Sequence, residues 1–345
     1  MSTARRPRRR LRRFLWLVVV LVAVFHVGGG FYFSGVIHEL ALSGEALRRT
    51  LDLEPDITVK AVTDSTIVLR ADDEQSPPAA LESGALFGLR WEGGHGTVGE
   101  VLRVQDGDVA RSFEVVSGTA PEPGTAVQIE PRVFASPQEA GVHAEDVVVD
   151  GPLGAYPAWL VDAGGPTWVV VVHGNSMSRL DNVRWLPALH DAGYPTLTIT
   201  YRNDAGAPED PSGLLRYGET EWEDLEAAVA YAVGAGSDGV VLLGDSMGGG
   251  VIESFLLRSE RARAVRAVVL DAPMLDFSRT VDDNAAREPL VGPITVPPTL
   301  TWTAKLIAAL RYDVEWSALD YLSDPKGLGS APTLIVHGDR DLTVP

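Results

Sequence analysis

Apolar and polar positions divide the chain into three regions with different periods. Residues 14–37 form an almost unbroken apolar run without Asp, Glu, Lys or Arg. From 56 to 134 the apolar residues fall into short runs typical of β-strands, and from about 146 valine-rich runs alternate with stretches of helical spacing. The 345 residues are enough for about two globular domains in addition to the apolar run.

The apolar run predicts a single membrane-spanning helix at residues 14–37. Because a helix rises about 1.5 Å per residue, about 20 apolar residues cross the hydrocarbon core of a bilayer. Residues 1–13 contain seven arginines and no acidic residue. This basic tail predicts a cytoplasmic amino terminus, a single-pass anchor in the cell membrane and an extracytoplasmic body. A cleaved signal peptide is the alternative, but no Ala-x-Ala site follows the run, so we favour an uncleaved signal-anchor.

The region after the anchor is expected to contain a stalk and a small β-rich module. Residues 38–55 have helical spacing and predict a stalk helix, whereas residues 56–140 predict the module. Asp106-Gly107 predicts a tight hairpin within it, because both residues tolerate positive φ. The module has one of two roles: it packs against or spaces other parts of the protein, or it gates or recruits a substrate or partner. Its candidate strands are Ile57–Val62, Thr66–Leu69, Ala85–Trp91, Val98–Val104, Val109–Val116 and Thr125–Phe134.

The remaining residues, 146–345, have the alternation of a parallel α/β sheet. Trp168–Val172 is apolar throughout, as a strand buried on both faces requires. Similar runs occur at Thr196–Thr200, Gly239–Leu243, Ala267–Leu270 and Thr333–Val336, and helical stretches lie between them at Asn182–Ala192, Thr220–Val233, Met247–Ser259 and Thr301–Leu310. We therefore expect an α/β fold with a doubly wound, mainly parallel sheet, preceded by the transmembrane helix and the β-rich module.

Charge and composition exclude several classes of function. Removing the seven tail arginines from the 29 basic residues leaves 22 against 47 acidic residues. So acidic a body repels polyanions, and we expect no nucleic-acid partner. The chain has no cysteine, which excludes disulfides, thiolate metal ligands and a cysteine nucleophile.

One motif combines a nucleophile with the geometry that such chemistry needs. Gly244-Asp-Ser246-Met-Gly248 follows a predicted strand and opens a predicted helix. Gly-x-Ser-x-Gly in this position is typical of a sharp strand-to-helix turn that exposes the serine Oγ above the sheet edge. Side chains at Gly244 and Gly248 would collide in such a turn, and the helix directs free N–H groups toward a developing oxyanion. Ser246 is therefore the candidate nucleophile.

Other polar residues near strand ends support the same site. The run His173-Gly-Asn175 ends an earlier strand, and the backbone N–H groups of Asn175 and Met247 are the candidate oxyanion donors. We expect His173 to orient this loop rather than to transfer protons. Arg202 is expected to form a structural ion pair rather than to bind a substrate carboxylate, and the acidic run 219–226 is expected to be a solvated helix face.

A third motif, from His337 to Pro345, follows the last predicted strand. The three motifs in this order resemble α/β-hydrolase-fold serine hydrolases, and in particular the membrane-anchored prolyl-oligopeptidase-like and Bem46-like group, over residues 146–345. The resemblance implies that Asp341 is the acid of a catalytic triad. The alternatives are Asp339, as second choice, and Asp271 or Asp276, which are expected to serve a loop or to cap a helix.

The resemblance implies a membrane-anchored hydrolase that cleaves an ester, thioester or amide through a serine nucleophile and an acyl-enzyme. No metal or organic cofactor is needed for this chemistry. The substrate is expected to be a small molecule, a lipid or a peptide. A cap insertion at 276–331 is rich in aromatic and aliphatic residues, which either line a substrate pocket or pack helices on the sheet.

The chain departs from the family in one respect. The catalytic histidine of the family follows the acid, and no histidine follows Asp341 here. We expect the sequence to be the incomplete part of a longer protein. The alternatives are a non-catalytic α/β-hydrolase-like binding or scaffold protein, and a histidine from elsewhere in the chain, such as His95, that reaches Ser246.

Overall fold

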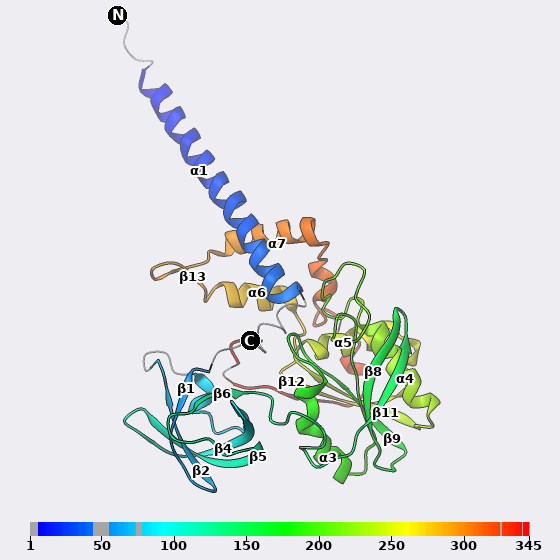
Figure 1. Ribbon diagram of the computed structural model, residues 1–345. Helices are drawn as coiled ribbons and strands as arrows, with labels where there is room; N and C mark the ends of the chain where they lie inside the picture. The colour runs from blue at the N-terminus through cyan, green and yellow to red at the C-terminus, as the bar shows by residue number, and fades with distance from the viewer. Residues whose placement is uncertain (1–5, 44–54, 74–77, 325, 340, 345) are drawn as a thin grey trace, which may run out of the picture.

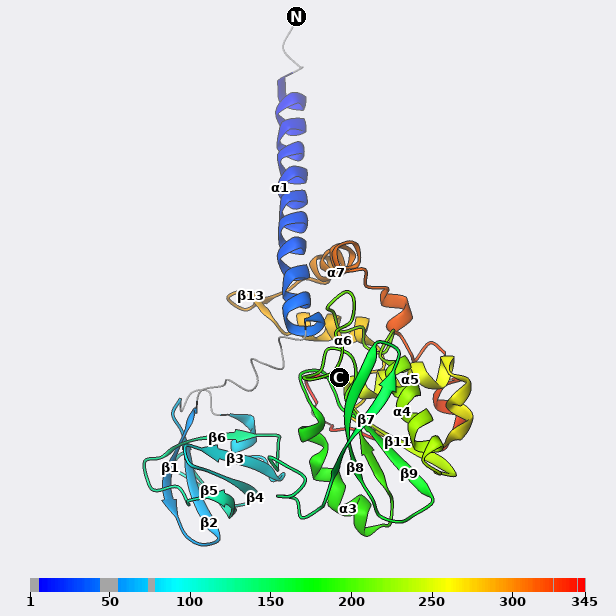
Figure 2. The same ribbon diagram turned by 45° about the vertical axis from the view of Figure 1, so that its right-hand side comes forward.

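The computed structural model describes residues 6–43, 55–73, 78–324, 326–339 and 341–344. Figure 1 shows two globular parts, a β-barrel and an α/β domain, and a long amino-terminal helix that projects from the α/β domain. The barrel and the α/β domain lie side by side in both views (Figure 2).

Helix α1 (Arg6–Ile37) is continuous through the glycine triplet 28–30 and is largely exposed. Within the described residues, Leu11–Leu42 is the one helical stretch long and apolar enough to cross a membrane, by length and composition. Of the stalk helix predicted at 38–55, the structure describes residues 38–43, and residues 38–42 are helical. The chain makes one π-helical turn (His38–Leu42), because Ser43 then pairs with Leu214 of the α/β domain in an isolated β-bridge. Residues 44–54 lie outside the described residues.

The β-rich module is a closed barrel in the order β1-β2-β5-β4-β3-β6, with antiparallel neighbours. Asp106 and Gly107 both have positive φ between two of its strands, which confirms the predicted hairpin. Alternate residues of each strand fill the barrel interior, as alternating burial requires. The strands are β1 (Ile57–Val62), β2 (Thr66–Ala71), β3 (Phe87–Trp91), β4 (Gly94–Gln105), β5 (Asp108–Gly118) and β6 (Ala126–Glu130).

The α/β domain contains a sheet in the order β15-β12-β11-β9-β10-β8-β7. Its strands are parallel except for β8, which pairs antiparallel with both β7 and β10, so the expected mainly parallel sheet is confirmed. The β7–β8 pair was not predicted. The strands are β7 (Glu145–Gly151), β8 (Gly154–Val161), β9 (Thr167–Val172), β10 (Thr196–Thr198), β11 (Gly239–Asp245), β12 (Val265–Asp271) and β15 (Thr333–Val336).

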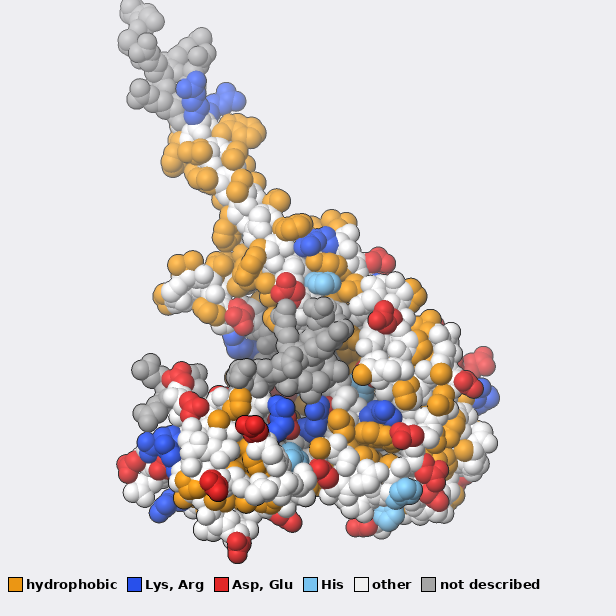
Figure 3. Space-filling model, in the orientation of Figure 1, with side chains coloured by type: hydrophobic (Ala, Val, Ile, Leu, Met, Phe, Trp, Pro, Cys, Tyr) orange, Lys and Arg blue, Asp and Glu red, His pale blue; other side chains and the backbone are white. Residues whose placement is uncertain are grey.

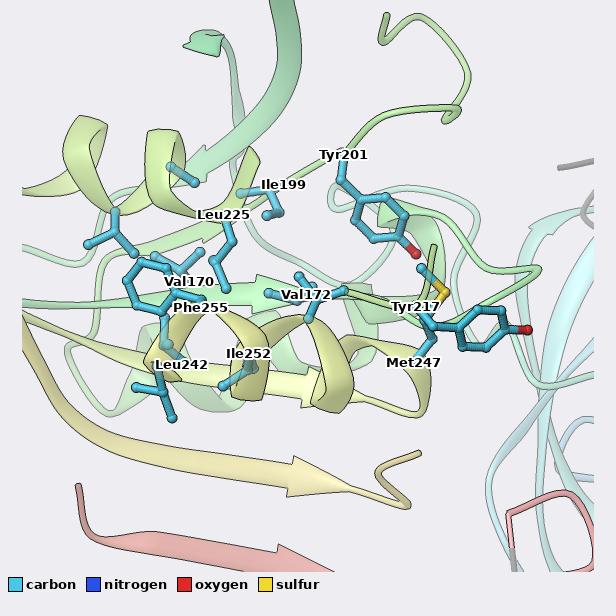
Figure 4. Close-up of a cluster of buried hydrophobic side chains, with 14 of the residues drawn as sticks. Val170, Val172, Ile199, Tyr201, Tyr217, Leu225, Leu242, Met247, Ile252 and Phe255 are labelled. Carbon is cyan, nitrogen blue, oxygen red and sulfur yellow. The ribbon is translucent and has the colours of Figure 1, made fainter. Parts of the chain in front are cut away.

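Helices cover both faces of this sheet. Val170 and Val172 of β9 pack toward α4 (Trp222–Gly234) and α5 (Met247–Arg258), as Figure 4 shows. The alternate residues Val169 and Val171 belong to a second cluster with Trp185 and Leu189, from the 3₁₀-helix Arg179–Trp185 and from α3 (Leu186–Asp191). Burial on both faces explains why this strand is a continuous valine run.

The segment 276–331, where a cap insertion is predicted, lies between β12 and β15, and we call it the cap. It consists of α6 (Phe277–Ala285), the hairpin β13–β14 (Pro289–Val291 and Ile294–Thr295), α7 (Pro298–Tyr312) and short 3₁₀-turns. Figure 1 places it between α1 and the sheet.

A buried carboxylate joins α5 to the end of the cap. Glu253 is fully buried, and its Oε1 accepts a hydrogen bond from the N–H of Leu328 at 2.8 Å. Its Oε2 has no hydrogen-bond partner in the described part of the chain. Burial raises the pKa of Glu253 to about 7, and the nearby Asp324 acts in the same direction.

The pKa of Glu253 predicts a specific dependence of stability on pH. Because the folded-state pKa is raised, native protein should lose stability relative to Glu253→Gln as the pH rises from about 4.5 to about 7. At pH 8 the Gln variant should be more stable by on the order of 1 kcal/mol, measured by thermal unfolding in detergent. The exposed Glu209→Gln serves as the control. An unchanged pH profile for Glu253→Gln would contradict the buried charge.

Candidate active site

Ser246 occupies a strained turn between β11 and α5. Its φ is 52° and its ψ is −116°, a conformation that costs about 1–3 kcal/mol for a residue with a side chain. Backbone hydrogen bonds hold it there. The Ser246 N–H donates to the carbonyl of Asp271 at 2.9 Å, and the Ser246 carbonyl accepts from Gly249 and Met274, also at 2.9 Å. The loop after β12 therefore fixes the turn.

The glycines of the motif allow α5 to begin against the sheet. A Cβ at Gly248 would lie 2.4 Å from the carbonyl oxygen of Val172, at the end of β9. A Cβ at Gly244 would lie 2.9 Å from the backbone of Gly248 and 2.6 Å from Ile252. All three distances are below 3.0 Å, and those to the backbone of Val172 and Gly248 cannot be relieved by moving a side chain, so neither position has room for a Cβ.

The loop after β9 lies directly against Ser246. A Cβ at Gly174 would be 2.9 Å from the Cβ of Ser246, so the next N–H groups of this loop are close to Ser246. Within the described residues, neither the N–H of Asn175 nor that of Met247 makes a turn, loop or cap hydrogen bond. Both predicted oxyanion donors are thus available. A small pocket beside them is lined by Gly174, Asn175, Ser176, Met177, Tyr201, Asn203, Asp204 and Leu215.

The side chain of Asn175 links this loop to the segment that follows α1. Its Nδ2 donates to the Tyr217 hydroxyl at 2.9 Å, and that hydroxyl donates to the carbonyl of Ala41 at 3.0 Å. Tyr217 also stacks on Phe277 of the cap, with ring centroids 3.8 Å apart. Burial raises the pKa of Tyr217, which keeps the hydroxyl protonated as a donor. No local pattern in the sequence indicated this connection.

His173 has a structural role, as expected. The side chain is buried, its Nε2 lies 2.7 Å from Asp204 Oδ2, and its Nδ1 lies 3.0 Å from the carbonyl of Gly174. Burial lowers the pKa of His173, but the contact with Asp204 outweighs this effect and the net pKa is raised. Both ring nitrogens are therefore used to hold the loop that carries Asn175.

Asp341 lies in the turn after β15. Its Oδ1 accepts the N–H groups of Thr343 and Val344 at 2.7 and 2.9 Å. Its Oδ2 is 3.7 Å from His337 Nε2, which lies 2.7 Å from the carbonyl of Val344. The turn thus fixes one carboxylate oxygen of Asp341 and leaves the other without a backbone donor, an arrangement that suits the acid of a triad.

The weaker acid candidates have structural partners. Asp276 caps α6 by accepting the N–H of Arg279 at 2.8 Å. Arg184 bridges Asp245 and Asp271, at 2.8 and 3.1 Å. Burial raises the pKa of Asp245 to about 6, although Arg184 opposes the shift. This bridge beneath the elbow was not predicted.

In the part of the chain that the structure describes, no histidine hydrogen-bonds to Ser246. His95 lies on β4 of the barrel, where its Nδ1 is 3.5 Å from Glu139. The same residues contain no group of three or more His, Asp or Glu that could hold a metal ion.

The charges around Arg202 agree with one expectation and correct another. Arg202 is buried and donates to Asp224 at 2.8 Å, so it forms the structural ion pair that we expected. The acidic run 219–226 is not a solvated face, because Asp224 and Glu221 are buried. Glu221 accepts the N–H groups of Arg216 and Gly218 at 2.7 and 2.9 Å, which shapes the turn before α4.

The strained elbow makes a testable prediction about stability. Ser246→Gly should raise the free energy of unfolding by about 1 kcal/mol, because glycine adopts positive φ without strain and this gain exceeds its entropic cost. Ser246→Ala keeps the Cβ and should show no comparable gain. Thermal unfolding of both variants in detergent measures the difference. Equal stability of the Gly and Ala variants would show that the turn is not strained.

Comparison with known proteins gives two family matches. Residues 186–345 match a family with the α/β-hydrolase fold, and residues 58–130 match a domain of unknown function (DUF8805). No curated protein sequence matches the chain.

Solved structures similar to this chain include two archaeal esterases and a fungal hydrolase. An esterase of Pyrococcus furiosus is 21% identical, with a TM-score of 0.44, covering 61% of this chain and 76% of the esterase. An esterase of Pyrobaculum calidifontis is 16% identical (TM-score 0.41), covering 59% of this chain and 66% of the esterase. The α/β hydrolase GrgF of a Penicillium species is 19% identical (TM-score 0.41), with coverages of 59% and 83%.

The fold assignment depends on the family match and on the geometry of the sheet. The matched residues include β11, the elbow and α5, and β11 lies inside the sheet with parallel neighbours on both sides. The strand-to-helix turn at Ser246 has the position in the sheet that the Gly-x-Ser-x-Gly turn occupies in this fold. The second globular part of the chain has the α/β-hydrolase fold.

Proposed function

We propose that the protein is a membrane-anchored serine hydrolase that cleaves an ester, thioester or amide. The observation that carries the proposal is the elbow. Ser246 is held at positive φ beside two backbone N–H groups, those of Asn175 and Met247, which have no loop partner among the described residues. Donors prepared in advance for a developing oxyanion typically contribute about 10²–10³ in rate each.

The chemistry follows from these groups. The Oγ of Ser246 forms a bond to the carbonyl carbon, its proton passes to a general base, and the two N–H groups stabilise the oxyanion. The base then protonates the leaving alcohol, thiol or amine, and water hydrolyses the acyl-enzyme by the reverse sequence. In this proposal the base is a histidine held by the Oδ2 of Asp341, and it is the component that the described residues do not place beside Ser246.

The membrane anchor is the second part of the proposal. α1 supports it by its length, its exposed apolar surface and the arginines at its amino-terminal end. The positive-inside rule then puts the tail in the cytoplasm and the hydrolase domain on the other side.

Covalent labelling tests the nucleophile. A fluorophosphonate should form a bond to the Oγ of Ser246, with loss of fluoride, in protein expressed from the complete source gene. Ser246→Ala should abolish labelling. Asp341→Asn should slow it at least 100-fold, because the histidine then lacks its orienting carboxylate. Asp339→Asn, two residues away in the same turn, is the matched control and should label at nearly the native rate.

A different result favours the second candidate function. If folded protein from the complete gene shows no labelling above the level of Ser246→Ala, the serine hydrolase is excluded. The absence of a histidine contact to Ser246 among the described residues would then indicate a non-catalytic binding or scaffold protein.

A further inference from the structure

The cap exposes an apolar surface that no part of the described chain covers. On α7, Trp302, Leu306 and Leu310 are 64%, 47% and 81% exposed, and their spacing of four residues places them on one side of the helix. On the β13–β14 hairpin, Val291 and Ile294 are 70% and 60% exposed. We call these five residues the cap ridge. Figure 3 shows hydrophobic side chains continuing from α1 onto α7 and the hairpin.

The cap ridge is separate from the packed side of α7. Leu300, Ala304 and Ala308 are buried in the domain. Lys305 extends toward α6 and pairs with Asp282 at 2.6 Å. The apolar residues of 276–331 were expected to line a pocket or to pack on the sheet, and the ridge does neither. Its residues point away from the domain.

α7 crosses α1 at the glycine triplet of α1. Gly29 and Gly30 of α1 lie against Leu300 and Thr303, where an added Cβ would be 3.0 and 2.8 Å from the nearest side-chain atom. The glycine triplet therefore serves a close helix crossing. Figures 1 and 2 show that α7 runs across α1 rather than along it.

Polar contacts join each end of α7 to α1. His26 Nε2 lies 3.1 Å from Thr299 Oγ1 at one end of α7. At the other end Arg311 donates to Ser34 Oγ at 2.7 Å, and its guanidinium lies 4.0 Å from the ring centroid of Phe31. α7 thus spans the levels of residues 26 to 34 of α1.

These levels correspond to the outer boundary of a bilayer. If the hydrocarbon core begins at Phe14, directly after the last arginine of the tail, about 30 Å at about 1.5 Å per residue ends near Ser34. α7 then lies within about 12 Å of that boundary on its inner side, with Arg311 at the headgroups. Amphipathic helices in the membrane interface bury their apolar side to about 5–10 Å, and tryptophan is enriched at that depth.

We propose that the cap ridge is immersed in the outer leaflet of the lipid bilayer. The hydrolase domain is then held against the membrane by its cap as well as tethered by α1. The inference depends on the membrane anchor in the proposed function, but not on the identity of the nucleophile.

An immersed cap ridge also sets the distance between the bilayer and the loop that carries Asn175. Ala41, whose carbonyl accepts the hydroxyl of Tyr217, follows Ser34 by seven residues, a rise of about 10 Å. Tyr217 in turn bonds to Asn175 of the oxyanion loop. The immersed cap therefore holds the side chain of Asn175, through Tyr217, near the level of Ala41, which lies about 10 Å from the hydrocarbon boundary.

The absence of cysteine permits a direct test. Single variants Leu306→Cys and Leu310→Cys of the full chain are labelled with a nitrobenzoxadiazole fluorophore and reconstituted in phosphatidylcholine vesicles. Nitroxide on a shallow acyl carbon should quench both labels at least twofold more than a label at Asp191→Cys, on the exposed end of α3. Phe25→Cys, near the middle of the predicted span, should be quenched most by a deep nitroxide.

The controls separate failure of the ridge from failure of the anchor. Quenching of Phe25→Cys with Leu306→Cys and Leu310→Cys at the level of Asp191→Cys would overturn the immersion of the ridge and retain the anchor. No quenching at Phe25→Cys would remove the anchor, and the immersion with it. Labels at the ridge that are protected from aqueous iodide but not quenched by lipid nitroxide would show that a second copy or another protein covers the ridge, which also overturns the proposal. Fluorophosphonate labelling of Ser246 is an independent readout of the hydrolase.

Discussion

The approach of α5 to the end of β9 is the constraint that organises the α/β domain. The helix begins so close to the sheet that Gly248 has no room for a side chain beside the carbonyl of Val172. The chain reaches this position only through a positive φ at Ser246, which hydrogen bonds to the loop after β12 maintain. The same turn removes the N–H of Met247 from the sheet ladder and leaves it beside the serine. The strained turn at Ser246 therefore explains both the close packing of α5 on the sheet and the free N–H of Met247 beside the serine.

The amino-terminal helix is attached to the domain at two places, which distinguishes it from a flexible tether. The carboxyl-terminal half of α1 crosses α7 at the glycine triplet. The segment after α1 enters the core of the α/β domain, where Leu42 is buried and its carbonyl accepts the N–H of Leu215 at 2.8 Å. The carbonyl of Ala41 accepts the hydroxyl of Tyr217, which in turn accepts a hydrogen bond from Asn175 in the loop after β9. A displacement of α1 relative to the cap would therefore disturb the hydrogen bonds that hold the side chain of Asn175. Helix α1 and the candidate site are parts of one packed unit.

Local signals predicted the parts of the fold that local physics decides. The valine run of β9 reflects burial on both faces of the sheet. The Asp106-Gly107 turn requires positive φ, and Gly244 and Gly248 have no room for a side chain. Long-range contacts decided the rest. Asp224 in the acidic run is buried because Arg202, far from it in sequence, neutralises it. The cap ridge could not be predicted for the same reason. The spacing of residues shows that one side of α7 is apolar, but it does not show whether the sheet or the lipid bilayer covers that side.

The most direct test of the central claim is a structure of the phosphonate adduct of the protein expressed from its complete gene. The account predicts phosphorus bonded to the Oγ of Ser246, with the phosphoryl oxygen about 2.7–3.1 Å from the N–H nitrogens of both Asn175 and Met247. It also predicts that the φ of Ser246 stays positive, because the turn is formed before the reaction. A phosphoryl oxygen directed away from these two donors, or an adduct on another residue, would contradict the account.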